Sequence, residues 1–419
     1  MGFTSITTYS YRNLQDQKVP LNARRIFLVG ENGQGKSNFL EAVYLLSYGS
    51  SFRTKRESEL ITRGKREMAL NGRYIRPEED DVEGTVAFKL AAGGSGPTGE
   101  AAGSASSGSD GPPGRPAFTA GSAGADGRPA PAHSAGTPAS SAFAGGSSRG
   151  NASKEKIIEL DGKRLQDRKQ LISHIPAIVF SHDDIYFVNG PPERRRWFFN
   201  QTMSLFDPMF IDTLRDYSKI LKMRNLALKE QRRDLIPVYD QQLAVAGIEI
   251  QRRRAEVIRE FNLVVAPIFG TVSTISEPLA IEYRPSWPRG AGAGTSKSKS
   301  TDTDTDTAAG AKSAGASGEA RAGAGAAGDG RDIPGEADLA SGIEQVCNYL
   351  AEKREQDLLY GTTSSGPHRD RFVFRLSGTD FARIASTGQL RLMSLILRIG
   401  QCRYFSQKTG RRPILLLDD

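Results

Sequence analysis

The stretch IFLVGENGQGKSNFLEA, at residues 26–42, constrains the fold more than any other feature of this chain. Its Gly30, Gly35, Lys36 and Ser37 have the spacing of a phosphate-binding loop. The apolar run RRIFLV precedes the loop and predicts a β-strand, and SNFLEAVYLLSYG follows it with helical spacing. A strand, a glycine-rich turn and a helix in this order predict a nucleoside triphosphate site in an α/β fold.

Each residue type in this loop has a physical task. Glycines let successive backbone N–H groups curl around phosphate oxygens, and the helix N-terminus adds its positive partial charge. Lys36 is the candidate catalytic cation because its ammonium reaches the transferred phosphate, and the Ser37 hydroxyl is a candidate Mg²⁺ ligand. The residues expected to bind ATP or GTP are Gly30, Glu31, Asn32, Gly33, Gln34, Gly35, Lys36 and Ser37.

A second apolar run, ILLL at residues 414–417, leads to two carboxylates. Such a run predicts a short buried strand, and ligands of open α/β sheets collect at the carboxyl ends of their strands. Asp418 is therefore a candidate Mg²⁺ ligand, and Asp419 is a candidate catalytic residue that orients the attacking water. The alternative is a pair of helix caps. Because the sequence stops after this pair, we expect it to be truncated.

Two long segments have a composition that does not suit a packed core. Residues 91–153 are rich in Gly, Ala, Ser and Pro, and they contain no Ile, Leu, Val, Met, Tyr or Trp. Residues 290–340 are similar, with a Ser-Lys run and alternating Thr and Asp at 301–307. Such segments bury too little apolar surface to offset the entropy of ordering them. We expect both to be disordered insertions.

The net charge and the cysteines bound the class of protein. A formal charge of +8 suits a polyanionic partner, nucleic acid first and an anionic membrane second, although a solvated basic surface is an equal alternative. Cys347 and Cys402 lack a CxxC or His companion, which argues against a disulfide framework or a zinc site. No apolar run reaches the roughly 18 residues of a membrane helix, so we expect a cytoplasmic protein without a membrane partner.

The stretch ASTGQLRLMSLILRIGQ, from Ala385, predicts a helix that starts with polar and small residues. A serine and a glycine at a helix start present a hydroxyl and free N–H groups to a phosphate. In ATP-binding-cassette (ABC) ATPases, such a start completes the nucleotide site of a second subunit. An ordinary capped helix is the alternative, but the position shortly before the ILLLDD run favours the functional interpretation.

The stretch SSGPHRDRFVFRL predicts a turn, a loop and then a strand. His368, Arg369 and Asp370 match the His-Arg-Asp of protein kinases, but Arg375 stands where the kinase loop has Asn, and the chain has a phosphate loop of a different class. We interpret the three residues as a structured loop near the nucleotide or DNA. A purely structural role is the alternative.

Together these motifs resemble the bacterial RecF family of DNA replication and repair proteins. The resemblance runs from SYRNL at Ser10 to the end of the chain and is most specific in SFRT and GPHRD. It implies an α/β P-loop ATPase head of the ABC and structural-maintenance-of-chromosomes type, with a mixed β-sheet and helices, plus a helical second lobe. Apolar spacing at 207–233 and 236–264 predicts a short antiparallel helical hairpin in that lobe. The expected domains are 1–90 and 154–190 for the N-terminal part of the head, 91–153 and 290–340 for the disordered insertions, 191–289 for the helical lobe, and 341–419 for the C-terminal part of the head.

The resemblance also implies residue roles. It assigns the phosphate loop to ATP, Asp418 to Mg²⁺ and Asp419 to hydrolysis. Arg12 and Asn13 would approach the nucleotide base. Three residues would meet ATP bound to a second subunit: Ser386, Gly388 and Gln389. Leu390 stands where the family has a second glutamine, and the family's later loop and histidine do not follow Asp419.

Basic residues are the candidates for DNA contact, because phosphates require Lys or Arg at an exposed surface. The candidates are Arg53, Lys55, Arg56, Arg194, Arg195 and Arg196, and a solvated charged face is the alternative for each cluster.

The resemblance implies an ATP-dependent DNA-binding recombination mediator that acts in replication, gap repair and SOS induction. ATP would drive a homodimer, and slow DNA-dependent hydrolysis would reopen it. The implied partners are single-stranded or gapped DNA, duplex DNA at junctions, RecR, RecO and, indirectly, RecA. A nuclease-associated or transporter-type ATPase is one alternative, and a scaffold that only binds ATP is another.

Overall fold

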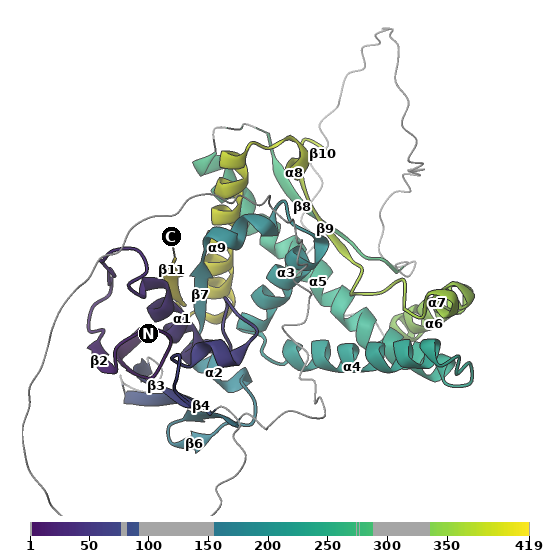
Figure 1. Cartoon of the computed structure of the whole chain (residues 1–419). Helices are drawn as coiled ribbons and strands as arrows, with labels where there is room; N and C mark the ends of the chain where they lie inside the picture. The colour runs from purple at the N-terminus through teal and green to yellow at the C-terminus, as the bar shows by residue number, and fades with distance from the viewer. Residues whose placement is uncertain are drawn as a thin grey trace, which may run out of the picture. The chain divides into compact units, whose positions relative to one another are not determined.

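The computed structural model describes residues 2–76, 82–91, 155–273, 275, 277–287 and 336–418. Almost all of both predicted insertions lies outside these residues, and so does Asp419. The chain separates into two compact units, Met1–His174 and Ile175–Asp419 (Figure 1). No helix of the described residues is both long and apolar enough to cross a membrane.

The Met1–His174 unit is built on an antiparallel sheet of six described strands. Their order is β2-β1-β3-β4-β5-β6, and α1 packs against β3 and β4. Apolar side chains such as Leu70, Tyr74 and Phe88 alternate along the strands and are buried, as expected for a sheet with one covered face. The bounds are β1 (Gly2–Tyr9), β2 (Gln17–Pro20), α1 (Lys36–Tyr48), η1 (Glu57–Leu60), β3 (Glu67–Arg76), β4 (Val82–Ala91), β5 (Glu155–Leu160), β6 (Lys163–Arg164) and α2 (Lys169–His174).

Helix α1 is the helix predicted after the phosphate loop, and glycines set both of its ends. Gly35 before it has a φ of 96° and Gly49 after it a φ of 65°, in the left-handed region that glycine adopts without strain. The Gly49 N–H donates to the carbonyl of Leu45, which satisfies one carbonyl of the last turn. The helix therefore begins directly at Lys36.

The strand predicted at RRIFLV is wrong. Residues 24–30 have no strand assignment, and Ile26, Phe27 and Val29 are 47%, 81% and 92% exposed. A strand requires a neighbour that pairs with its backbone N–H and C=O groups. The described strands of this unit pair only with one another, so the apolar run has no strand partner there.

The Ile175–Asp419 unit is mainly helical and contains two small sheets among its described residues. One is antiparallel, in the order β10-β9-β8, and the other is the parallel pair β11 and β7. The bounds are β7 (Ala177–Phe180), η2 (His182–Phe187), α3 (Pro192–Phe206), α4 (Phe210–Lys229), α5 (Ile236–Val272), β8 (Leu279–Arg284), α6 (Glu336–Glu352), α7 (Arg354–Tyr360), β9 (Arg371–Leu376), β10 (Thr379–Asp380), α8 (Phe381–Ile384), α9 (Thr387–Thr409) and β11 (Ile414–Leu417).

Helices α4 and α5 confirm the predicted hairpin: they follow each other through a short connection and pack together (Figure 1). Their buried positions recur at helical spacing, with Leu214 and Tyr217 on α4 and Leu243 and Ile250 on α5. Aromatic rings continue this core where α5 meets α3 and β9. Along this core, α9 also packs against α5 and α3.

Two boundaries differ from the predicted domains. Helix α6 begins at Glu336, so the last residues of the predicted 290–340 insertion are helical. The reason is that Ile343, Val346 and Leu350 extend an apolar helical face that composition alone did not reveal. Residues 175–190 group with the second unit because β7 pairs with β11.

Candidate nucleotide-binding site

The phosphate loop has the backbone that its glycines allow. Gly33 has a φ of 83°, and a side chain at Gly35 would approach Leu14 Cδ2 to 2.5 Å. The Lys36 ammonium donates to the carbonyls of Gly30 at 2.7 Å and Glu31 at 2.9 Å. Lys36 is thus held over the loop by main-chain oxygens, and its position does not depend on a carboxylate. A cationic side chain above a turn of left-handed glycines suits an anion.

Of the two residues predicted near the base, Asn13 contacts the loop and Arg12 points elsewhere. The Asn13 amide donates to the carbonyl of Gly33 at 2.9 Å. Arg12 gives two hydrogen bonds, at 2.8 and 2.9 Å, to Glu41 on α1. Burial opposes the charge on Arg12, but the bonds to Glu41 raise its pKa above the ordinary value. A nucleotide contact by Arg12 would compete with this ion pair.

Glu41 was not among the site residues predicted from the sequence. Its side chain is fully buried, and besides Arg12 it accepts hydrogen bonds from the hydroxyls of Tyr11, at 2.8 Å, and Ser51. Burial, followed by the proximity of Glu41, raises the pKa of Tyr11. The signal was a glutamate within an otherwise apolar helix, FLEAVYLL, since a buried carboxylate requires partners.

In the second unit, Asp418 lies at the carboxyl end of a parallel strand pair. Strand β11 pairs with β7 in the register Leu417 to Phe180, and the Asp418 N–H donates to the Phe180 carbonyl at 2.8 Å. The strand and its edge are as predicted, but the predicted burial is wrong for Leu415 and Leu417, which are 51% and 68% exposed. The hydroxyl of Ser37 and the carboxylate of Asp418 are of the chemical class that Mg²⁺ prefers. Among the described residues, however, no three His, Cys, Asp or Glu side chains gather into a metal site.

Helix α9 begins with a reciprocal cap at the predicted polar segment. The Ser386 hydroxyl accepts a hydrogen bond from the Gln389 N–H at 3.3 Å, and the Gln389 side chain accepts one from the Ser386 N–H at 2.8 Å. Gly388 is exposed beside them. Leu390 is only 8% exposed, so the leucine that replaces the family's second glutamine packs into the core. The cap engages the N–H groups of Ser386 and Gln389 and does not involve those of Thr387 and Gly388.

Known relatives match along the whole chain, although no family model matches. RecF, the DNA replication and repair protein of Treponema pallidum, is 28% identical over 99% of this chain and 85% of its own length. RecF of an Anaeromyxobacter species is 28% identical over 100% and 85%. The chain is thus similar to RecF proteins along nearly its whole length. A solved structure of the recombination mediator RecF with ATP has the same fold, at a TM-score of 0.69, 23% identity and coverage of 100% of this chain and 84% of its own.

The GPHRD motif, which carried much of the resemblance to RecF, forms a buried polar network. The Asp370 carboxylate is fully buried and accepts hydrogen bonds from Arg254 at 2.9 Å, Gln251 at 2.9 Å and Tyr283. His368 lies between the Tyr217 hydroxyl, 2.7 Å from Nδ1, and the Thr363 carbonyl, 3.1 Å from Nε2. These contacts favour the structural alternative for His368 and Asp370. Arg369, between them, is exposed.

The arginines of α3 also serve the fold. Arg195 donates to the carbonyls of Phe372 and Val188, at 3.0 and 2.7 Å. Arg196 donates to the Asp370 carbonyl at 2.8 Å and pairs with Glu193. Burial lowers the pKa of both guanidinium groups. Because both guanidinium groups donate to carbonyls within the protein, these two residues lose support as DNA contacts.

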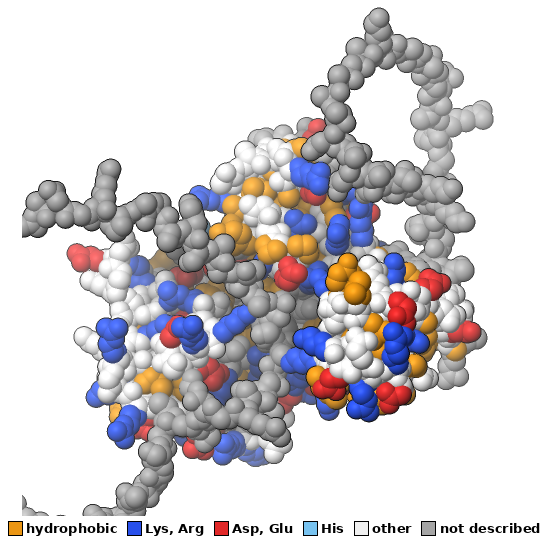
Figure 2. Space-filling view, turned by 45° about the vertical axis from the view of Figure 1, so that its right-hand side comes forward, with side chains coloured by type: hydrophobic (Ala, Val, Ile, Leu, Met, Phe, Trp, Pro, Cys, Tyr) orange, Lys and Arg blue, Asp and Glu red, His pale blue; other side chains and the backbone are white. Residues whose placement is uncertain are grey.

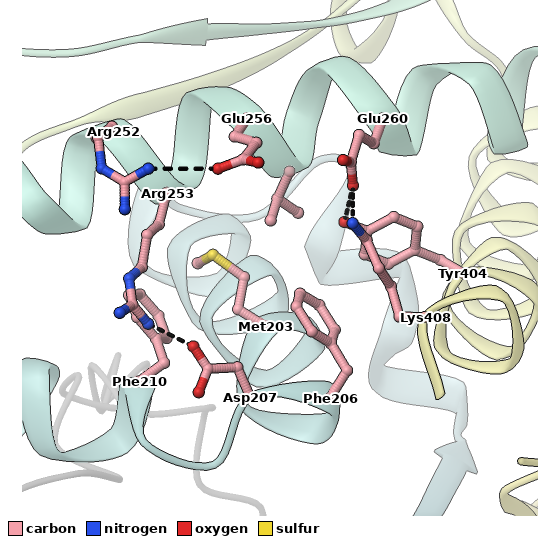
Figure 3. Close-up of a pocket in the computed structure, with 11 residues that line it drawn as sticks. Met203, Phe206, Asp207, Phe210, Arg252, Arg253, Glu256, Glu260, Tyr404 and Lys408 are labelled. Atoms are coloured by element: carbon pink, nitrogen blue, oxygen red, sulfur yellow. Dashed lines mark hydrogen bonds and ion pairs between the residues drawn. The ribbon is translucent and has the colours of Figure 1, made fainter. Parts of the chain in front are cut away.

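A pocket of about 230 Å³ lies where α3, α4, α5 and α9 meet, and it contains no predicted residue (Figure 3). Met203, Phe206 and Phe210 form an apolar floor. Charges at its rim are paired: Arg253 with Asp207, Arg252 with Glu256 and Lys408 with Glu260. A rim whose charges cancel does not suit a polyphosphate. Lys and Arg side chains are instead scattered over the face seen in Figure 2, interspersed with acids.

Proposed function

We propose that this chain is an ATP-dependent DNA-binding recombination mediator that acts in DNA replication, gap repair and SOS induction. The observation that carries the proposal is the phosphate loop, with its left-handed glycines and its Lys36 ammonium. The nearly full-length similarity to proteins named RecF, one of them solved with ATP, supports both the nucleotide and the pathway. The net charge of +8 agrees with a nucleic-acid partner.

In the proposed site, the loop N–H groups and Lys36 bind the β- and γ-phosphates of ATP. Mg²⁺, held by Ser37 and Asp418, would neutralise phosphate charge. Asp419 would orient the attacking water. Asn13 would sit at the nucleotide beside the loop. We expect hydrolysis at this site to be slow. The alternative is a chain that binds ATP without turnover.

The proposed assembly is a homodimer with ATP between two copies. Phosphates on one copy would meet the free N–H groups at the start of α9 of the other, near Ser386, Gly388 and Gln389. Only the closed dimer makes both sets of contacts, so ATP shifts the population toward it. In the cytoplasm, the dimer would bind gapped or junction DNA and act with RecR and RecO, and through them on RecA.

Sedimentation velocity of the full chain tests this proposal. We expect a monomer alone, a dimer with ATP and Mg²⁺, and a further shift with gapped duplex DNA. ADP serves as the matched control, since it lacks the phosphate that would reach the second copy. A sedimentation coefficient that does not respond to ATP, at concentrations where ATP binds, would contradict the sandwich. An ATP dimer with no affinity for DNA would instead favour the transporter-type alternative.

A further inference from the structure

Three consecutive hydrogen bonds lead away from the phosphate loop. Asn13 donates to the Gly33 carbonyl at 2.9 Å, and Asn38 donates to the Asn13 side-chain oxygen at 2.7 Å. Arg53 then donates to the Asn38 side-chain oxygen at 2.6 Å. Each amide thus gives one bond toward the loop and accepts one from the direction of Arg53. The series joins a carbonyl of the nucleotide site to an exposed guanidinium.

The segment that contains Arg53 is fixed to the helix of the phosphate loop. Glu41 lies one helical turn after Ser37 on α1 and accepts a hydrogen bond from the Ser51 hydroxyl. That hydroxyl in turn accepts the N–H groups of Arg53 and Thr54, both at 2.9 Å. Because the Glu41 carboxylate is fully buried, this anchor has little freedom to move. Hydrogen bonds therefore join the segment around Arg53 to α1.

Residues 51–66, called the basic loop below, suit a polyanion. They contain six Lys and Arg residues and two Glu residues. Both acids are already engaged, Glu57 with Lys156 and Glu59 with Arg56. Arg63, Lys65 and Arg66 are exposed. The partner class with the matching charge and extent is a nucleic-acid backbone.

We propose that Asn13 and Asn38 couple the nucleotide site to the basic loop, so that DNA held by Arg53 changes the affinity for ATP. A DNA phosphate competes for the Arg53 guanidinium, because a charge-assisted hydrogen bond is stronger than one to a neutral amide. Asn38 then loses a partner, and the Asn13 contact with the Gly33 carbonyl is free to change. The coupling is reciprocal: ATP changes DNA affinity by the same factor.

The inference rests on the proposed function and is tested by a coupling ratio. The ratio is the dissociation constant of ATP without DNA divided by that with saturating 20-base-pair duplex, measured by titration calorimetry on the full chain. For the wild type we expect a departure from unity of about fivefold or more. Asn38→Ala should bring the ratio to about 1. Asn71→Ala is the control, since Asn71 is exposed on β3 of the same unit, and it should keep the wild-type ratio.

Each other outcome contradicts the inference in a distinct way. If a folded Asn38→Ala variant keeps the wild-type ratio, the Asn13 and Asn38 amides do not transmit the coupling. A wild type that binds ATP and DNA independently shows that there is no coupling to transmit. A wild type that binds neither overturns the proposed function as well. If Asn38→Ala does not fold, Arg53→Ala is measured in its place. This variant should still bind ATP but should have a coupling ratio of about 1. A wild-type ratio in Arg53→Ala would refute the coupling through Asn13 and Asn38.

Discussion

The phosphate loop at 30–37 and the GPHRD loop at 366–370 both look like functional motifs, yet they use their polar groups in opposite ways. Lys36 is held at the surface by two main-chain carbonyls and keeps its charge available to a ligand. Asp370 is fully buried, and its oxygens are occupied by side chains from other elements. A motif that is characteristic of a protein family can therefore mark either a ligand contact or a polar group that fixes how helices and strands pack together.

The largest expected effect is a loss of stability caused by a substitution in the GPHRD loop. Asp370→Asn removes the negative charge beside Arg254, which is itself only 3% exposed, and leaves that cation without its charged partner. We expect the free energy of unfolding to fall by about 3 kcal/mol, while ATP affinity changes little. Urea unfolding followed by tryptophan fluorescence reports it, because Trp287 donates to Ser365 beside the same loop.

Asp183→Asn is the matched control for that substitution. The side chain of Asp183 is 70% exposed in the same unit, so the expected change in stability is below about 0.5 kcal/mol. Equal effects of the two substitutions would show that the Asp370 network does not stabilise the fold, and the contrast between the two motifs would then lose its basis.

The next effect is a pH dependence from His368. Burial lowers the pKa of His368 to about 4, from 6.5. Between these values the unfolded chain binds a proton that the folded chain does not, so stability is complete above pH 6.5 and falls as the pH falls toward 4. From pH 7 to pH 4.5 we expect a loss of roughly 2 to 3 kcal/mol that His368→Gln lacks. Unfolding free energies of both proteins at both pH values measure it, and parallel profiles would contradict it.

Much of the fold could be predicted because local patterns determine it. Apolar spacing was sufficient for α1, the α4–α5 hairpin and the start of α9, and the ILLL run for β11. The strand at RRIFLV could not be judged from its own residues, because a strand forms only where a neighbour pairs with it. The start of α6 was missed since the composition of residues 290–340 as a whole concealed its last, helical residues.

For the same reason, only some residues of the candidate site could be predicted from the sequence. The loop glycines and Lys36 are contiguous, and their spacing carries their chemistry. Arg12 and Glu41 are far apart in sequence, so their ion pair depends on how the segment after β1 meets α1. Arg194 to Arg196 look like one basic cluster in the sequence, yet Arg195 and Arg196 are directed into the unit, because a helix distributes consecutive residues over different faces.

The smallest predicted change in free energy comes from a substitution in the phosphate loop. Lys36→Met keeps the length and apolar stem of the side chain but removes the ammonium that faces the loop carbonyls Gly30 and Glu31. The ATP phosphates lose one charge-assisted contact, about 2 kcal/mol, so ATP should bind about 30-fold more weakly. Stability should change by less than about 0.5 kcal/mol, since no buried group loses a partner. Lys18→Met, an exposed lysine on β2, is the control and should alter neither quantity. Titration calorimetry with ATP and urea unfolding on the same samples separate the two outcomes. A Lys36 variant that loses stability but binds ATP normally would reverse the roles assigned to the two loops, because Lys36 would then act as the structural group.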